Sequence, residues 1–166
     1  MGTRFGPSQN GDLMRLAKET ELAYAAGFFD GEGWITIETR RLKNQPNINW
    51  RLRIGAGQDS VEPLLIFQEI WGGTIIKAKT RANGKTSHQW WLSTNMASRF
   101  LRDVLPYLIV KRRQAEIAIE FRNGIDGKVR PGVKGLSKEE LDRRYLLRDE
   151  LMSQERRRRP AQIRNI

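Results

Sequence analysis

The most distinctive stretch of this 166-residue chain is Ala25-Ala-Gly-Phe-Phe-Asp-Gly-Glu-Gly33. It closes a helical pattern over residues 19–30, and the glycines that follow predict the end of that helix. Small or short side chains recur on one helix face, which allows a second helix backbone to approach closely. These residues are Ala23, Ala26, Gly27 and Asp30. The final Gly-Glu-Gly places Glu32 at the helix end, with the Gly31 carbonyl accessible to an ion.

Two stretches after this motif alternate between apolar and polar residues, as half-buried strands do. In residues 34–40, Ile35 and Ile37 are expected to face a core. In residues 50–54, Leu52 and Ile54 do the same, and residues 44–47 form a turn between the two strands. The outward positions are Thr36, Glu38, Arg40, Arg51 and Arg53. A helix is then expected over residues 60–71, before Gly72-Gly73.

A second strand pair is predicted over residues 74–81 and 87–93, joined at Asn83-Gly84, a strong hairpin signal. Its outward cations are expected to be Lys77, Lys79 and Arg81. Two helices follow over residues 96–105 and 107–123, separated at Pro106. After a loop over residues 124–135, Ser137 and Glu140 form a capping box that opens a last helix to about residue 154.

These elements give the order α-β-β-α-β-β-α-α with one further helix, and predict an α+β fold. Helices are expected behind an antiparallel sheet, with a basic face in front that could lie in a DNA major groove. One polar face is ordinary for a half-buried sheet, but here the outward residues are mostly Arg and Lys. The predicted DNA contacts are Thr36, Glu38, Arg40, Arg51, Arg53, Lys77, Lys79, Arg81, Gln89 and Trp91. We expect an N-terminal segment (1–18), one domain (19–154) and a flexible basic tail (155–166).

The charge balance also favours a polyanionic partner. Thirty Lys and Arg against nineteen Asp and Glu leave a net charge of +11, and cationic side chains bind phosphates with release of counterions. The absence of cysteine excludes disulfides, thiolate zinc sites and cysteine nucleophiles. With no long apolar run and no apolar signal region, neither a membrane partner nor secretion is expected. The expected location is intracellular, in an organelle or in bacterial or archaeal cytoplasm.

The Gly-Glu-Gly motif resembles the LAGLIDADG motif of homing endonucleases, and the chain is similar to the single-motif branch that acts as homodimers. Pro106-Tyr-Leu-Ile-Val-Lys-Arg-Arg-Gln-Ala115 matches a second segment of that branch, and Gln58, after the second strand, matches a polar position near the site. The resemblance covers roughly residues 22–122. It implies a saddle-like DNA-binding sheet and a homodimer that packs through Ala23, Ala26, Gly27 and Asp30. Ala25 departs from the usual Leu at the start of the motif.

The resemblance implies a metal-dependent endonuclease. Glu32 and the Gly31 carbonyl would hold Mg²⁺, with Mn²⁺ able to substitute and Ca²⁺ supporting binding without cleavage. Lys111 would offset charge at the phosphate, and Gln58 would orient water. The implied product is a double-strand break with short 3′ overhangs in a long pseudo-palindromic duplex. Two alternatives remain: a non-cleaving relative or RNA maturase with the same fold, and a basic ribosomal or structural RNA-binding protein.

Overall fold

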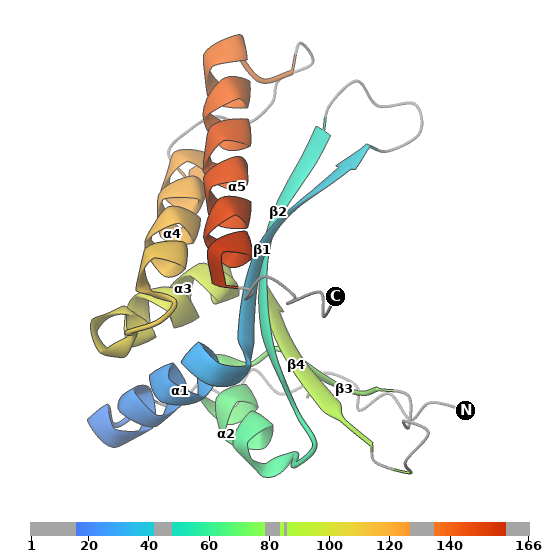
Figure 1. Ribbon diagram of the computed structural model, residues 1–166, viewed down its shortest axis with the longest axis vertical. Helices are drawn as coiled ribbons and strands as arrows, with labels where there is room; N and C mark the ends of the chain where they lie inside the picture. The colour runs from blue at the N-terminus through green and yellow to red at the C-terminus, as the bar shows by residue number, and fades with distance from the viewer. Residues whose placement is uncertain (1–15, 42–47, 79–83, 85, 127–134, 159–166) are drawn as a thin grey trace, which may run out of the picture.

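The computed structural model describes residues 16–41, 48–78, 84, 86–126 and 135–158 (Figure 1). The strands are β1 (Gly33–Arg41), β2 (Ile48–Gln58), β3 (Thr74–Lys77) and β4 (His88–Ser93). The helices are α1 (Glu19–Glu32), α2 (Glu62–Trp71), α3 (Thr94–Val104), the 3-10 helix η1 (Leu105–Tyr107), α4 (Arg112–Asp126) and α5 (Lys138–Arg158). The expected order of strands and helices is confirmed. The expected turns at residues 44–47 and at Asn83 lie outside the described residues.

The four strands form one antiparallel sheet in the order β1-β2-β4-β3. All the helices lie on one side of it, and both ends of the sheet curve away from them (Figure 1). The opposite side is therefore a concave face, not covered by any described helix. This arrangement confirms an α+β fold with a saddle-like sheet backed by helices.

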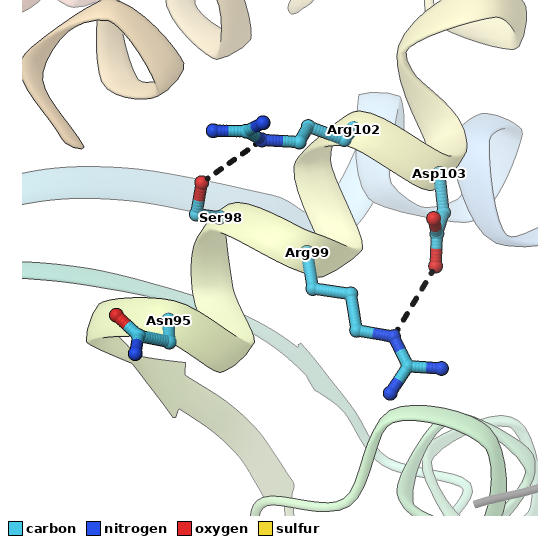
Figure 2. A pocket seen from close by; sticks show the side chains of 5 residues that line it. All are labelled: Asn95, Ser98, Arg99, Arg102 and Asp103. Atoms are coloured by element: carbon cyan, nitrogen blue, oxygen red, sulfur yellow. Dashed lines mark hydrogen bonds and ion pairs between the residues drawn. The ribbon is translucent and has the colours of Figure 1, made fainter. Parts of the chain in front are cut away.

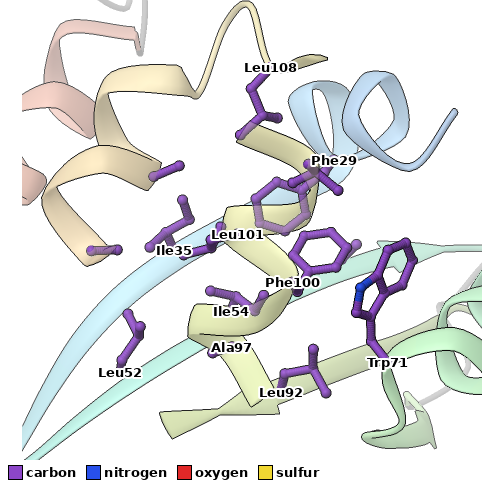
Figure 3. Close-up of a cluster of buried hydrophobic side chains, with 14 of the residues drawn as sticks. Phe29, Ile35, Leu52, Ile54, Trp71, Leu92, Ala97, Phe100, Leu101 and Leu108 are labelled. Carbon is purple, nitrogen blue, oxygen red and sulfur yellow. The ribbon is translucent and has the colours of Figure 1, made fainter. Parts of the chain in front are cut away.

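The core forms where the alternating strands meet the apolar helix faces. Ile35 and Ile37 of β1 and Leu52 and Ile54 of β2 are buried against the helices, as predicted. An aromatic cluster centres on Phe100 of α3 (Figure 3). Its ring centroid lies 5.1 Å from Phe29, 4.9 Å from Trp71 and 5.2 Å from Trp90. These contacts fix α1, α2 and α3 against the sheet, because edge-to-face ring packing adds to the gain from burial.

The first helix continues further than expected. We predicted that it ends at Asp30, but Gly31 and Glu32 are helical and Gly33 begins β1. A Cβ at Gly33 would lie 2.4 Å from a ring carbon of Phe29 and 2.5 Å from its carbonyl oxygen, whereas one at Gly31 would meet nothing. Of these two glycines, Gly33 is therefore the one that the fold requires, because the chain passes so close to Phe29 there.

The region after Pro106 also differs from the prediction. The helix expected over residues 107–123 begins only at Arg112, and residues 108–111 form a non-helical connection after η1. The last helix continues to Arg158, so residues 155–158 of the expected tail are helical. Ser137 Oγ accepts the Glu140 N–H at 3.2 Å, as in a capping box. The Glu140 carboxylate instead binds Arg143 and Arg144.

Candidate functional site

The C-terminal end of α1 brings two of the expected catalytic residues to one edge of the sheet. Glu32 is the last residue of α1 and its side chain is exposed. Gly33 pairs with Ala56, so Gln58 lies two residues beyond that pair, beside the point where α1 ends. Gln58 was expected to follow the second strand but is its last residue. Its Oε1 accepts the Asp59 N–H at 2.8 Å.

Asp30 holds the third expected catalytic residue at the same end of α1. Its Oδ2 accepts the N–H groups of Ile109 and Val110 at 2.8 and 3.0 Å, and its Oδ1 accepts that of Lys111 at 2.8 Å. The Lys111 ammonium donates to the Asp30 carbonyl oxygen. Asp30 therefore fixes the connection that precedes α4, and it positions Lys111 beside Gly31 and Glu32.

The protonation of Asp30 follows from these contacts. Burial alone would raise the pKa of this carboxyl, but the three backbone N–H donors and the Lys111 charge outweigh it. The pKa of Asp30 therefore lies below its ordinary value of 3.8. Because the folded pKa is depressed, the stabilisation is complete above the ordinary value and is lost as pH falls through the folded pKa.

Asp30→Asn is expected to lower the free energy of unfolding by about 1–2 kcal/mol at pH 7, since Asn presents an N–H₂ group where a carboxylate oxygen accepts. The difference from the unchanged protein should shrink as pH falls below about 4, where the native carboxyl also becomes protonated. Urea unfolding between pH 3 and pH 8 measures it. Asp142→Asn, at an exposed position of α5, is the matched control. If the two proteins differ in free energy of unfolding by the same amount at pH 3 and pH 7, the ionised Asp30 carboxylate does not stabilise the fold as assigned.

Only part of the predicted small-residue face of α1 is exposed. Ala26 is fully buried in the core of this chain, and Asp30 is bonded to residues 109–111. The exposed small residues are Ala23, Gly27 and Gly31, each four positions apart. A Cβ at Gly27 or Gly31 would meet nothing within 4 Å. Packing within the described chain therefore does not require a glycine at either position.

The concave face of the sheet carries most of the expected DNA contacts. Thr36 lies opposite Arg53 and Glu38 opposite Arg51, and the odd-numbered positions of β2 continue this face to Gly55 and Gly57, opposite Trp91 and Gln89. A groove on this face is lined by Glu38, Arg40, Asn49, Arg51 and Arg53. Such a cationic groove on an exposed sheet can bind the phosphates and base edges of a duplex.

The prediction for the second strand pair was partly wrong. Ile75 lies opposite the buried Trp90, and Lys77 lies opposite His88 on the same side. Lys77 therefore lies on the helix-covered side of the sheet, away from Arg51 and Arg53 on the concave side. Thr74 and Ile76 lie on the concave side. Lys79 and Arg81 lie outside the described residues.

Trp34 and Asn49 also lie on the concave face, but they were not among the predicted contacts. Trp34 precedes Thr36 by two positions in β1, and Asn49 precedes Arg51 by two positions in β2. The alternation that identified Thr36 and Arg51 would have found both, because side chains two residues apart in a strand share a face.

A second hollow lies on α3, lined by Asn95, Ser98, Arg99, Arg102 and Asp103 (Figure 2). Arg102 Nε donates to Ser98 Oγ at 3.3 Å, and Arg99 lies 4.0 Å from Asp103. Asp103 Oδ2 also accepts a hydrogen bond from Trp71 Nε1 at 2.8 Å. The bond from Trp71 joins α2 to α3, and the other two contacts lie within α3. No expected site residue lines this hollow.

The described residues hold no group of three or more His, Cys, Asp or Glu side chains able to bind a metal. The Glu32 side chain is exposed and has no hydrogen-bond or ion-pair partner in the described part of the chain. One carboxylate and one carbonyl fit an oxygen-preferring cation such as Mg²⁺, which keeps several waters and accepts phosphate oxygens. None of the described helices combines the length and apolar character of a membrane span.

Comparison with known proteins agrees with this geometry. A model of the LAGLIDADG endonuclease family matches residues 25–113, just over half of the chain. The structure is similar to that of the homing endonuclease I-CvuI in complex with a DNA target, with a TM-score of 0.64 and 23% identity over 89% of this chain and 87% of that one. It is also similar to the archaeal intron-encoded homing endonuclease I-Vdi141I complexed with DNA, with a TM-score of 0.67 and 20% identity over 83% and 86%. No curated protein matches by sequence.

The matched segment begins in α1, includes Gly31 and Glu32, and continues through the whole sheet to Lys111. It therefore spans both the end of α1 and the concave basic face. The similar solved structures, at low identity, support the same fold over most of the chain. The chain belongs to the LAGLIDADG endonuclease family.

Proposed function

We propose that this protein is a site-specific DNA endonuclease that acts as a homodimer with a divalent metal. It makes a double-strand break with short 3′ overhangs in a long pseudo-palindromic target. The observation that carries the proposal is the convergence of Glu32, Gln58 and Lys111 at the end of α1, at the edge of a basic concave face. A protein that only binds nucleic acid does not require a carboxylate beside bound phosphates, because that charge repels them.

The three residues divide the chemistry among them. Glu32 and the Gly31 carbonyl would hold Mg²⁺, which when bound supplies activation of the attacking water and stabilisation of the leaving 3′ oxygen. Lys111, held by Asp30, places its ammonium where negative charge accumulates on the scissile phosphate. The Gln58 amide orients water at the end of β2. I-CvuI has been solved with DNA in the presence of Mg or of Ca, which supports a divalent ion; Mn²⁺ is expected to replace Mg²⁺, and Ca²⁺ to support binding alone.

The homodimer follows from the number of carboxylates. One chain offers a single Glu32 at the site, and a break in both strands requires one such group at each scissile phosphate. The exposed small residues Ala23, Gly27 and Gly31 allow the α1 helices of two copies to approach closely, which places both Glu32 side chains near the two-fold axis. A two-fold protein reads a target whose half-sites share that symmetry.

Incubation of the protein with a randomised duplex library in Mg²⁺, followed by sequencing of the cut ends, tests the proposal. We expect one long, near-palindromic site whose ends carry short 3′ overhangs. Retention of a specific duplex without any cut ends would instead identify a sequence-specific binder. Maturase activity on a structured RNA would then be the next assay.

A further inference from the structure

Two tryptophans converge on the concave face at a glycine of β2, one of the two interior strands. Gly55 of β2 lies opposite Trp34 of β1 on one side and opposite Trp91 of β4 on the other. A Cβ at Gly55 would lie 2.5 Å from Cζ2 of Trp34 and 2.6 Å from the carbonyl oxygen of Trp90. The Trp34 indole therefore occupies the space that a side chain at position 55 would need.

Arg53, two residues before Gly55 on the same face, packs against both indoles. Its guanidinium carbon lies 4.6 Å from the ring centroid of Trp91 and 5.8 Å from that of Trp34. Both distances are within the range of cation–π attraction. The side chain of Arg53 is only 28% exposed. An arginine held in this way loses less conformational entropy when it binds a ligand than a freely rotating one.

Glu38 fixes the orientation of the same guanidinium. Arg53 Nη1 donates to Glu38 Oε1 at 2.8 Å, although Arg51 is the residue directly opposite Glu38 in the strand register. Arg53 Nε is buried without a hydrogen-bond partner in the described structure. Nη2 and the second N–H of Nη1 therefore remain for a ligand above the sheet. The nearby Glu38 charge disfavours a phosphate there, so a neutral acceptor is favoured.

We propose that Trp34, Glu38, Arg53 and Trp91 form an arginine clamp that reads a guanine at one base pair of each half-site. This inference rests on the proposed function, since it assumes that duplex DNA lies on the concave face. Guanine presents O6 and N7 side by side in the major groove, and the two outer N–H groups of an arginine match them. No other base presents two adjacent acceptors there.

The position of this base pair within the half-site follows from the strand register. Arg53 lies opposite Thr36, three residues along β1 from Gly33, where α1 ends; Arg51 lies two residues farther from that end. Strands rise about 3.3 Å per residue, and stacked base pairs are about 3.4 Å apart. The guanine read by Arg53 should therefore lie about two base pairs closer to the centre of the target than the base read by Arg51.

The test is selection of bound duplexes from a randomised library by the intact protein in Ca²⁺, which needs no cutting. The unchanged protein should select guanine at one symmetric pair of positions, about ten- to hundredfold over other bases. Arg53→Lys keeps the charge but loses the planar pair of N–H donors. It should remove the preference for guanine at these positions and leave the preferences at other positions unchanged. Trp91→Leu should weaken it by at least about threefold and leave the other positions unchanged. Arg51→Lys is the matched control and should alter a position farther out.

The outcomes separate this inference from the proposed function. If the unchanged protein selects a site and Arg53→Lys selects the same bases, Arg53 does not read a base. If Arg53→Lys no longer selects guanine but Trp91→Leu keeps the full preference for it, Trp91 does not hold Arg53 in place, and the proposed clamp is wrong. Recovery of no common sequence by the unchanged protein would overturn the proposed function itself, and the clamp with it.

Discussion

Glu32→Gln is expected to abolish DNA cleavage and to leave DNA binding intact. The substitution keeps the size and polar character of the side chain but removes the negative charge that a divalent cation requires. We expect cleavage to slow by at least about a thousandfold, equivalent to about 4 kcal/mol in the activation barrier. Single-turnover cleavage of the selected target in Mg²⁺ measures this effect.

Binding provides the contrasting measurement. The loss of a carboxylate from each copy removes repulsion from the phosphates, so affinity without metal should be unchanged or higher. Glu139→Gln, at an exposed position on α5, makes the same chemical change away from the site and should cut normally. Cleavage by Glu32→Gln within tenfold of the normal rate would exclude Glu32 as the metal ligand. A loss of binding together with cleavage would indicate damage to the dimer or the fold.

The alternation of apolar and polar residues predicted the faces of β1 and β2 because each has a clear apolar side, such as Ile35 and Ile37 in β1. It failed for β3, where Ile75 and Ile76 are adjacent. Either isoleucine could face the core, and only pairing with β4 decides it, since Trp90 is buried and Trp91 is not. A short strand with two adjacent apolar residues does not carry its register in its own sequence.

The connection after Pro106 depended on a contact that the local sequence does not contain. The N–H groups of residues 109–111 are satisfied by Asp30, about eighty residues earlier. Without that acceptor, the helical pattern of the segment suggests an earlier helix start. Glu32 and Lys111 lie at the same end of α1, and their expected roles in one site come from two segments of one family pattern. The arginine clamp was not predictable, since it joins side chains from three strands.

Gly27→Leu is expected to convert the protein from a dimer to a monomer without unfolding it. Gly27 is exposed in α1, and a side chain there meets nothing in this chain. Replacement of an exposed helical glycine should stabilise the helix itself by a few tenths to about 1 kcal/mol. A leucine side chain would, however, hold the partner helix several ångströms away and prevent close packing. Ala23→Leu, on the same exposed face, should act in the same way.

Light scattering coupled to gel filtration measures the change directly. The unchanged protein should have twice the chain mass of 19.2 kDa, and Gly27→Leu should have the mass of one chain with an undiminished melting temperature. Double-strand cleavage should fall by more than about a hundredfold, because a monomer brings only one Glu32 to the target. Glu139→Leu adds the same side chain to an exposed position of α5 and should remain dimeric. A Gly27→Leu protein that remains dimeric and cuts both strands would place the interface elsewhere than α1.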